Sequence, residues 1–116
     1  MRHNYKNLKI WQLGIDIAND ISDILLDFPK HERYDLSSQL SRCSVSIPSN
    51  IAEGSARTDK SFSHFLDISL GSSFELITQL LVAKHRKYIN QIIFNQLETK
   101  IEEFQRMTMG FQNGLQ

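Results

Sequence analysis

A stripe of polar side chains between residues 36 and 53 is the part of the sequence best equipped for chemistry. Its members recur every three or four positions, the spacing of one helix face, and they are Gln39, Arg42, Ser46, Asn50 and Glu53. A guanidinium, an amide and a carboxylate on one face could bind a small polar ligand. They could also form a hydrogen-bonded network that fixes the register of a helix contact, which we favour. Arg42 and Glu53 lie three turns apart, so each is expected to find its partner on another helix, with Glu75 and Gln79 as candidates.

The other reactive groups predict no catalytic or metal centre. The segment from His31 to Asp35 has an aspartate where a zinc-protease motif needs its second histidine, and the four histidines fit no ligand spacing. Cys43 is the single cysteine, so no disulfide can form within the chain, and we expect it to be a buried small hydrophobe. An acidic row on the first helix is interpreted as a solvated face, and its members are Asp16, Asp20, Asp23 and Asp27. We therefore expect no cofactor.

Two basic clusters could contact phosphate. Lys84, Arg86 and Lys87 lie near the end of the third predicted helix, where cations also interact favourably with the helix dipole. Arg2, Lys6 and Lys9 precede or begin the first. The chain has 13 basic and 13 acidic residues, so any attraction to nucleic acid must come from such local patches. We take the first cluster as the candidate nucleic-acid contact.

The elements that position these groups are predicted to be four helices. Apolar residues recur at helical spacing in about residues 8–28, 36–53, 60–88 and 90–110. Asp35, Thr58 or Asp59, and Asn90 are expected to begin the last three helices, and Gly54 to end the second in a left-handed conformation. Pro48 should kink the second helix. Short connectors make sequential helices antiparallel, which predicts an all-α, up-down-up-down four-helix bundle.

Length and composition fit one soluble domain over residues 1–116. The chain is 41% hydrophobic and 22% charged, too apolar for disorder. The first residues lack the apolar core of a signal peptide, and we see no run of about 18 apolar residues. We therefore expect a cytoplasmic protein with no membrane contact.

Apolar surface on the first and third helices predicts self-association. The apolar positions of the first helix cover an arc of roughly 220°, wider than one core-facing stripe of about 100°. The third helix carries a second apolar row beside the row that is expected to face the core. The candidate subunit-interface residues are Ile10, Ile17, Ile24, Leu70, Phe74 and Leu81. The alternative is an irregular bundle in which the first helix is central.

One segment of the second helix resembles a family signature. It reads Ser44-Val45-Ser46-Ile47-Pro48-Ser49-Asn50-Ile51-Ala52-Glu53-Gly54. Further matches lie at residues 8–12, 28–36 and 65–72. The chain thus resembles the four helix bundle proteins, among them proteins encoded in intervening sequences of the large-subunit ribosomal RNA gene.

The resemblance implies a fold, an assembly and no enzymatic activity. Members of this family are expected to form homopentameric rings, and the family is similar to the basic pentameric accessory protein of diversity-generating retroelements, which works with a reverse transcriptase and nucleic acid. RNA binding is suspected for the intervening-sequence members. The residues that match the signature are assigned to fold and assembly, and they include Arg42, Ser46, Asn50, Glu53 and Gly54.

Three functions are therefore open. The first is a non-enzymatic homo-oligomeric ring, pentameric by resemblance, that binds RNA or a nucleoprotein through its basic ends. The second is a protein-binding scaffold without a nucleic-acid role. The third, which we rank last, is a bundle that binds a small ligand at Arg42, Asn50 and Glu53.

Overall fold

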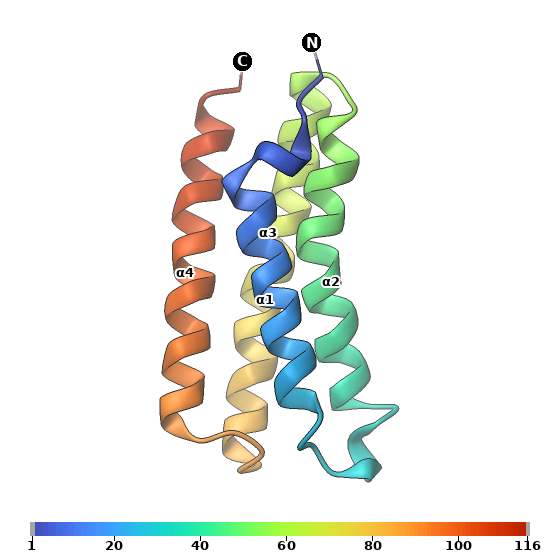
Figure 1. The fold of residues 1–116 in the computed structure, drawn as a ribbon, viewed down its shortest axis with the longest axis vertical. Helices are drawn as coiled ribbons and strands as arrows, with labels where there is room; N and C mark the ends of the chain where they lie inside the picture. The colour runs from blue at the N-terminus through green and yellow to red at the C-terminus, as the bar shows by residue number, and fades with distance from the viewer. Residues whose placement is uncertain (1, 116) are drawn as a thin grey trace.

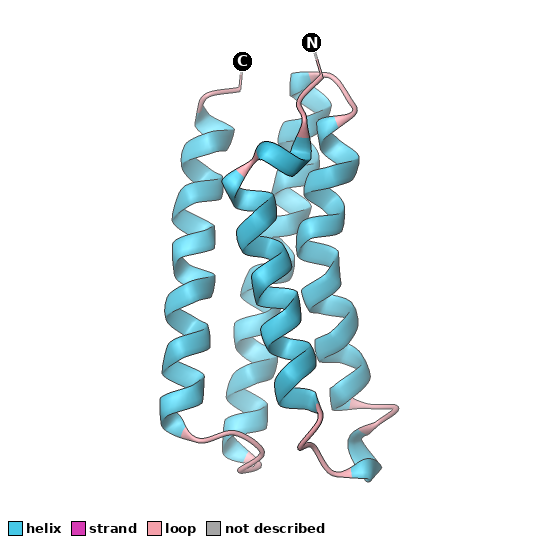
Figure 2. Ribbon diagram, viewed as in Figure 1, coloured by secondary structure: helices cyan, strands magenta, loops and turns pink. Residues whose placement is uncertain are grey.

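Four long helices run side by side along the molecule (Figure 1). The computed structural model describes residues 2–115. Two short 3-10 helices accompany the α-helices, and the described residues contain no strand (Figure 2). In chain order the elements are η1 (Tyr5–Asn7), α1 (Lys9–Leu25), η2 (Lys30–Glu32), α2 (Leu36–Ser55), α3 (Asp59–His85) and α4 (Gln91–Asn113). The predicted all-α four-helix bundle is confirmed.

Each helix contacts the two helices next to it around the bundle. Within the described residues, α1 packs on α2 and α4, and α3 packs on the same two, so α1 and α3 are diagonal partners. Both termini and the α2–α3 turn lie at one end of the bundle, which we call the terminal end (Figure 1). The α1–α2 and α3–α4 connectors lie at the other, which we call the loop end. The bundle measures 46 × 25 × 20 Å, so the two ends are well separated.

The core follows one buried stripe from each helix. The side chains that are buried completely include Ile17, Ile47, Leu76 and Ile101, one from each of the four helices. Burial of such a side chain stabilises a fold by about 1.5–3 kcal/mol, and this term rather than any polar contact holds the bundle together. Cys43 is among the buried residues, as the sequence predicts.

Most helix boundaries follow the expected signals. Thr58 and Asn90 begin α3 and α4, and their side chains accept hydrogen bonds from the backbone N–H groups of Ser61 and Ile93. Asp35 precedes α2, but its carboxylate accepts a bond from the Gln39 side chain instead of capping the helix. α3 ends at His85, earlier than predicted, because Lys87 adopts a positive φ of 66° that stops the helix.

Two glycines allow close helix packing. A Cβ on Gly14 of α1 would lie 3.3 Å from Cβ of Pro48, so α1 approaches α2 where Pro48 offers a smooth surface. Gly54 is inside α2, which continues to Ser55, and its φ is negative, so the predicted left-handed cap is wrong. Its Cβ would lie only 2.7 Å from Phe62 and from Phe65. α2 is continuous through Pro48, and the kink there stays a prediction.

Part of the predicted subunit interface is wrong. Ile10, Ile17 and Leu70 are buried within the subunit, so they offer no surface to a second copy. Ile24 is half-buried against the same core. The apolar spacing of the sequence predicts how wide the apolar arc of α1 is, but not which side of that arc faces the core. The side predicted to contact a second subunit is the one that faces the core. Phe74 and Leu81 are exposed, by 52% and 45%, and their part in an interface stays a prediction.

Replacing Gly54 with alanine should destabilise the bundle by about 1–3 kcal/mol, because the added methyl group overpacks against two phenylalanines. Gly110 of α4 is the matched control, since nothing lies within 4 Å of its Cβ position. Gly110→Ala should stabilise by about 0.5–1 kcal/mol through helix propensity alone. Chemical denaturation measures both, and equal effects of the two substitutions would contradict this packing.

Candidate functional site

The polar stripe of α2 forms a small hydrogen-bonded network at the contact with α3. The Ser46 hydroxyl lies 2.9 Å from that of Ser72, and the Asn50 side-chain amide donates to both the carbonyl and the hydroxyl of Ser46. One turn before Ser72 in α3, the buried Ser69 hydroxyl donates to the Ile47 carbonyl at 2.8 Å. Small side chains thus join two helix backbones by direct bonds, which supports the structural interpretation of Ser46 and Asn50.

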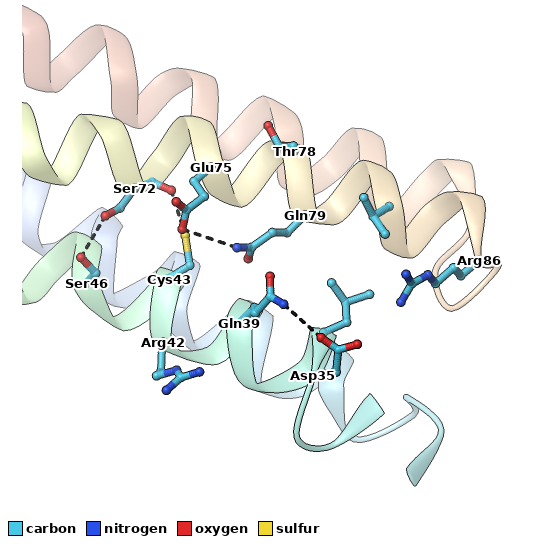
Figure 3. A pocket seen from close by; sticks show the side chains of 12 residues that line it. Asp35, Gln39, Arg42, Cys43, Ser46, Ser72, Glu75, Thr78, Gln79 and Arg86 are labelled. Carbon is cyan, nitrogen blue, oxygen red and sulfur yellow. Dashed lines mark hydrogen bonds between the residues drawn. The ribbon is translucent and has the colours of Figure 1, made fainter. Parts of the chain in front are cut away.

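Arg42 and Glu53 do not join this network. Glu53 pairs with Arg57, which lies just beyond the end of α2, at 3.1 Å, instead of reaching α3. Arg42 lines an open groove of about 670 Å³ between α2 and α3 that Glu75 also lines, but its guanidinium points away from Glu75 (Figure 3). Among the described residues the Arg42 side chain has no hydrogen bond or ion pair. Asn50 and Glu53 do not line the groove, so the structure does not bring together the three residues of the small-ligand hypothesis.

The groove contains no activated nucleophile. The Cys43 thiol donates to the Ser72 carbonyl at 3.1 Å. Burial, followed by the nearby Glu75 carboxylate, raises the pKa of Cys43 to about 12, so the thiolate is negligible at neutral pH. Gln79 reaches Glu75 through its amide nitrogen, whereas its buried Oε1 has no partner among the described residues. The lining mixes both charges, which is typical of a solvated helix contact.

A buried carboxylate at the loop end ties the two connectors together. Glu32 in η2 is 4% exposed, and its Oε2 accepts from Arg86 at 2.7 Å and from the Tyr88 hydroxyl at 2.6 Å. These two bonds lower the pKa of Glu32, with the Tyr88 contribution the larger, and the same carboxylate raises the pKa of Tyr88. We call these three residues the Glu32 clamp. Sequence analysis missed it, because partners more than 50 residues apart leave no local pattern.

The three candidate nucleic-acid contacts are placed differently. Arg86 is held by Glu32, so its first role is structural. Lys84 donates to Gln91 and lies 4.9 Å over the Phe94 ring. Lys87 is exposed, and its side chain has no hydrogen bond or ion pair in the described chain. Lys87 is thus the one of the three whose charge is fully available to a ligand.

Charge is segregated along the bundle axis although the chain is neutral overall. The terminal end, residues 2–9 and 53–61, carries five Lys and Arg against two carboxylates. The loop end, residues 26–36 and 83–92, carries five against three. The middle carries three against eight, so an acidic band separates two basic ends. An anionic ligand would therefore be attracted to an end and repelled by the sides.

Two apolar surfaces remain open on the outside. The α3 outer face consists of exposed residues one turn apart, namely Gly71, Phe74, Thr78 and Leu81. The α1–α2 groove is a hollow of about 390 Å³ whose apolar lining includes Trp11, Ile15, Ala18, Val45 and Pro48. Because α1 and α3 are diagonal partners, these surfaces lie on different sides of the bundle.

No group of three or more His, Cys, Asp or Glu side chains within residues 2–115 could hold a metal ion. One described helix, α3, is long and apolar enough to cross a membrane, with a mean hydropathy of 1.3 over its best window. This differs from the expectation drawn from the sequence. The core helix of a soluble protein meets the same criterion, and eight residues of α3 are buried in the four-helix bundle.

Comparison with known proteins agrees with this architecture. A crystal structure of a protein of unknown function from the S23 ribosomal protein family of Bacteroides thetaiotaomicron superimposes with a TM-score of 0.81 at 19% identity, over 89% of this chain and 97% of that one. At that identity the likeness establishes the fold. No curated protein matches the chain. The model of the 23S rRNA-intervening sequence protein family matches residues 6–110, and the chain belongs to this family.

The Glu32 clamp should make stability depend on acid pH. Because the pKa of Glu32 is lowered on folding, its contribution is complete above the unfolded pKa near 4.5 and is lost as pH falls through the lower folded value. Melting temperatures from pH 6 to 3 should therefore fall more steeply for the wild type than for Glu32→Gln. Glu102→Gln, at an exposed position, serves as the control. Parallel curves for the wild type and Glu32→Gln would contradict the clamp.

Proposed function

We propose that this protein is a non-enzymatic bundle that assembles with copies of itself and binds nucleic acid at its basic ends. The observation that carries the assembly is the α3 outer face. Phe74 and Leu81 present large apolar side chains to solvent two turns apart on one face of α3, and a second copy that covers this face would remove both from water. The absence of an activated nucleophile in the α2–α3 groove favours a binding role over catalysis.

The partner of the α3 outer face is proposed to be the α1–α2 groove of the next copy. The groove has the complementary shape and polarity, since it is concave and lined by Trp11, Ile15 and Val45. When two copies join through two different surfaces, the dimer still has one free α3 outer face and one free α1–α2 groove. Further copies can therefore add until the ring closes. The ring size of five comes from the family resemblance alone.

Nucleic-acid binding is supported by the charge segregation. Copies joined through their sides keep the basic ends free, and parallel packing would gather like ends on one face of the ring. Each copy then adds its cations to a common surface, so modest local charge becomes an avid site. A scaffold that binds a protein partner is the alternative, and it shares the assembly but not the affinity for nucleic acid.

Glutamate at Phe74 should dissociate the assembly, because a charge would be buried in an apolar contact. Loss of a central aromatic anchor alone costs about 2 kcal/mol or more per contact. Light scattering should show a lower mass for Phe74→Glu and for Val45→Glu in the groove. Ile92→Glu, at an exposed site on α4 outside both surfaces, is the control and should leave the mass unchanged.

Mixing the two variants tests whether the contact joins different surfaces. Phe74→Glu keeps an intact groove, and Val45→Glu keeps an intact α3 outer face, so an equimolar mixture should form a dimer that neither forms alone. A wild-type monomer at micromolar concentration would overturn the assembly. A mixture that stays monomeric would overturn the pairing of these two surfaces.

Binding to a single-stranded RNA should weaken steeply with salt if the basic ends contact phosphate. Substituting Lys87 with glutamine should reduce the slope of log affinity against log salt by about 0.7 for each copy in contact. Lys100→Gln is the matched control, because Lys100 lies in the acidic middle and pairs with Asp20 at 2.6 Å. Fluorescence anisotropy provides the measurement. If the protein assembles but does not bind RNA at low salt, the result would favour the alternative function, a scaffold that binds a protein partner.

A further inference from the structure

An exposed tyrosine marks the loop end. Tyr34, in the turn between η2 and α2, is 86% exposed, the highest value among the large apolar and aromatic side chains of the described chain. The Arg33 guanidinium lies over its ring at 5.4 Å from the centroid. With so little of the ring covered, its other face is open to solvent. A large aromatic ring in this state gains nothing from the subunit's own core.

The turn that presents Tyr34 is held rigidly. Backbone bonds close it on both sides of the tyrosine, from Arg33 N–H to the Lys30 carbonyl and from Asp35 N–H to the Glu32 carbonyl, at 3.1 and 3.0 Å. The Glu32 clamp fixes the same turn to the α3–α4 connector. The ring is therefore offered from a preorganised position, which lowers the entropy lost when a ligand binds it.

Cations lie on both connectors of the loop end, and they outnumber its exposed carboxylates, Asp27 and Asp35. Lys30 and Arg33 belong to the same connector as Tyr34, and Lys87 belongs to the α3–α4 connector that the clamp brings alongside. The Glu32 charge is buried and compensated by Arg86. The His31 ring is also exposed, and its Nε2 lies 3.2 Å from the Tyr88 hydroxyl.

We infer that the loop end is a binding site for single-stranded nucleic acid, in which an unpaired base stacks on Tyr34 while Lys30, Arg33 and Lys87 hold the adjoining phosphates. An aromatic platform beside a basic surface is the general means of binding single strands without sequence preference. A duplex cannot use the platform, because its bases already stack on one another. The inference rests on the proposed affinity of the basic ends for nucleic acid, and it adds the strandedness of the ligand and the residue that selects it.

The test uses the full-length protein and a twelve-nucleotide RNA of mixed sequence with a central 2-aminopurine, whose fluorescence falls when the base stacks. Wild-type protein should bind this strand and quench the probe, and should bind the matching duplex more weakly. Tyr34→Ala should weaken binding of the single strand by about tenfold and abolish the quenching. It should leave the salt slope unchanged, because no charge is removed.

Two control variants separate stacking from general surface effects. Tyr34→Phe keeps the ring and should bind and quench as the wild type does. Leu26→Ala removes a side chain that is 84% exposed in the same connector but has no π face, and it should change neither readout. Light scattering on each variant checks that the assembly is intact, because Tyr34 lies outside both apolar surfaces.

The outcomes distinguish the inference from the proposal beneath it. Salt-sensitive binding that Tyr34→Ala leaves unchanged would overturn the stacking site and keep the basic ends as the binding surface. Equal affinity for the strand and the duplex would do the same. No binding by the wild type at low salt would overturn both. Loss of affinity in Tyr34→Ala together with an unquenched probe in the wild type would assign Tyr34 to phosphate or sugar contact and overturn base stacking.

Discussion

The close approach of α2 and α3 is the constraint on which the rest of the structure depends. Small side chains permit it, and the Ser69 hydroxyl uses it to reach the Ile47 carbonyl, a bond that larger residues would prevent. Gly54 extends the same approach to the turn, where no Cβ fits beside Phe62. Once α2 and α3 are joined this closely, the position of α1 and α4 follows from burial of the remaining stripes.

This packing also explains the long signature of the family without an active site. Within Ser44 to Gly54, the buried members meet α1 or α3, and the polar ones at Ser46 and Asn50 satisfy each other at the contact. The buried positions of this segment, Ser44, Ile47, Pro48, Ile51 and Gly54, tolerate little change because they are enclosed by the neighbouring helices. Dense sequence requirements of this kind arise from helix packing as readily as from catalysis.

The sequence predicted the helices and their order because both depend on local signals. Apolar spacing identified four segments, and Thr58 and Asn90 marked two helix starts through side chains that cap within one turn. The wrong predictions concern contacts between helices and connectors, about which the spacing of apolar residues carries no information. The apolar arc on α1 was too wide to show which of its sides faces the core. The close contact between Gly14 and Pro48 determines that side. The Glu32 clamp joins two connectors, and only the fold brings them together.

The difference in charge and polarity between the ends and the sides of the bundle follows from the same architecture. An antiparallel bundle buries its length and leaves its ends to connectors, where most charged residues stay in solvent and cost little. The exception is Glu32, which is buried and compensated by Arg86 and Tyr88. In the proposed assembly, the sides contact sibling copies through their apolar rows, and the basic ends stay available to an anionic ligand. The overall neutrality of the chain is therefore a poor guide to binding. The local charge at each end decides it, because at physiological salt charges interact over only about 8 Å, far less than the 46 Å length of the bundle.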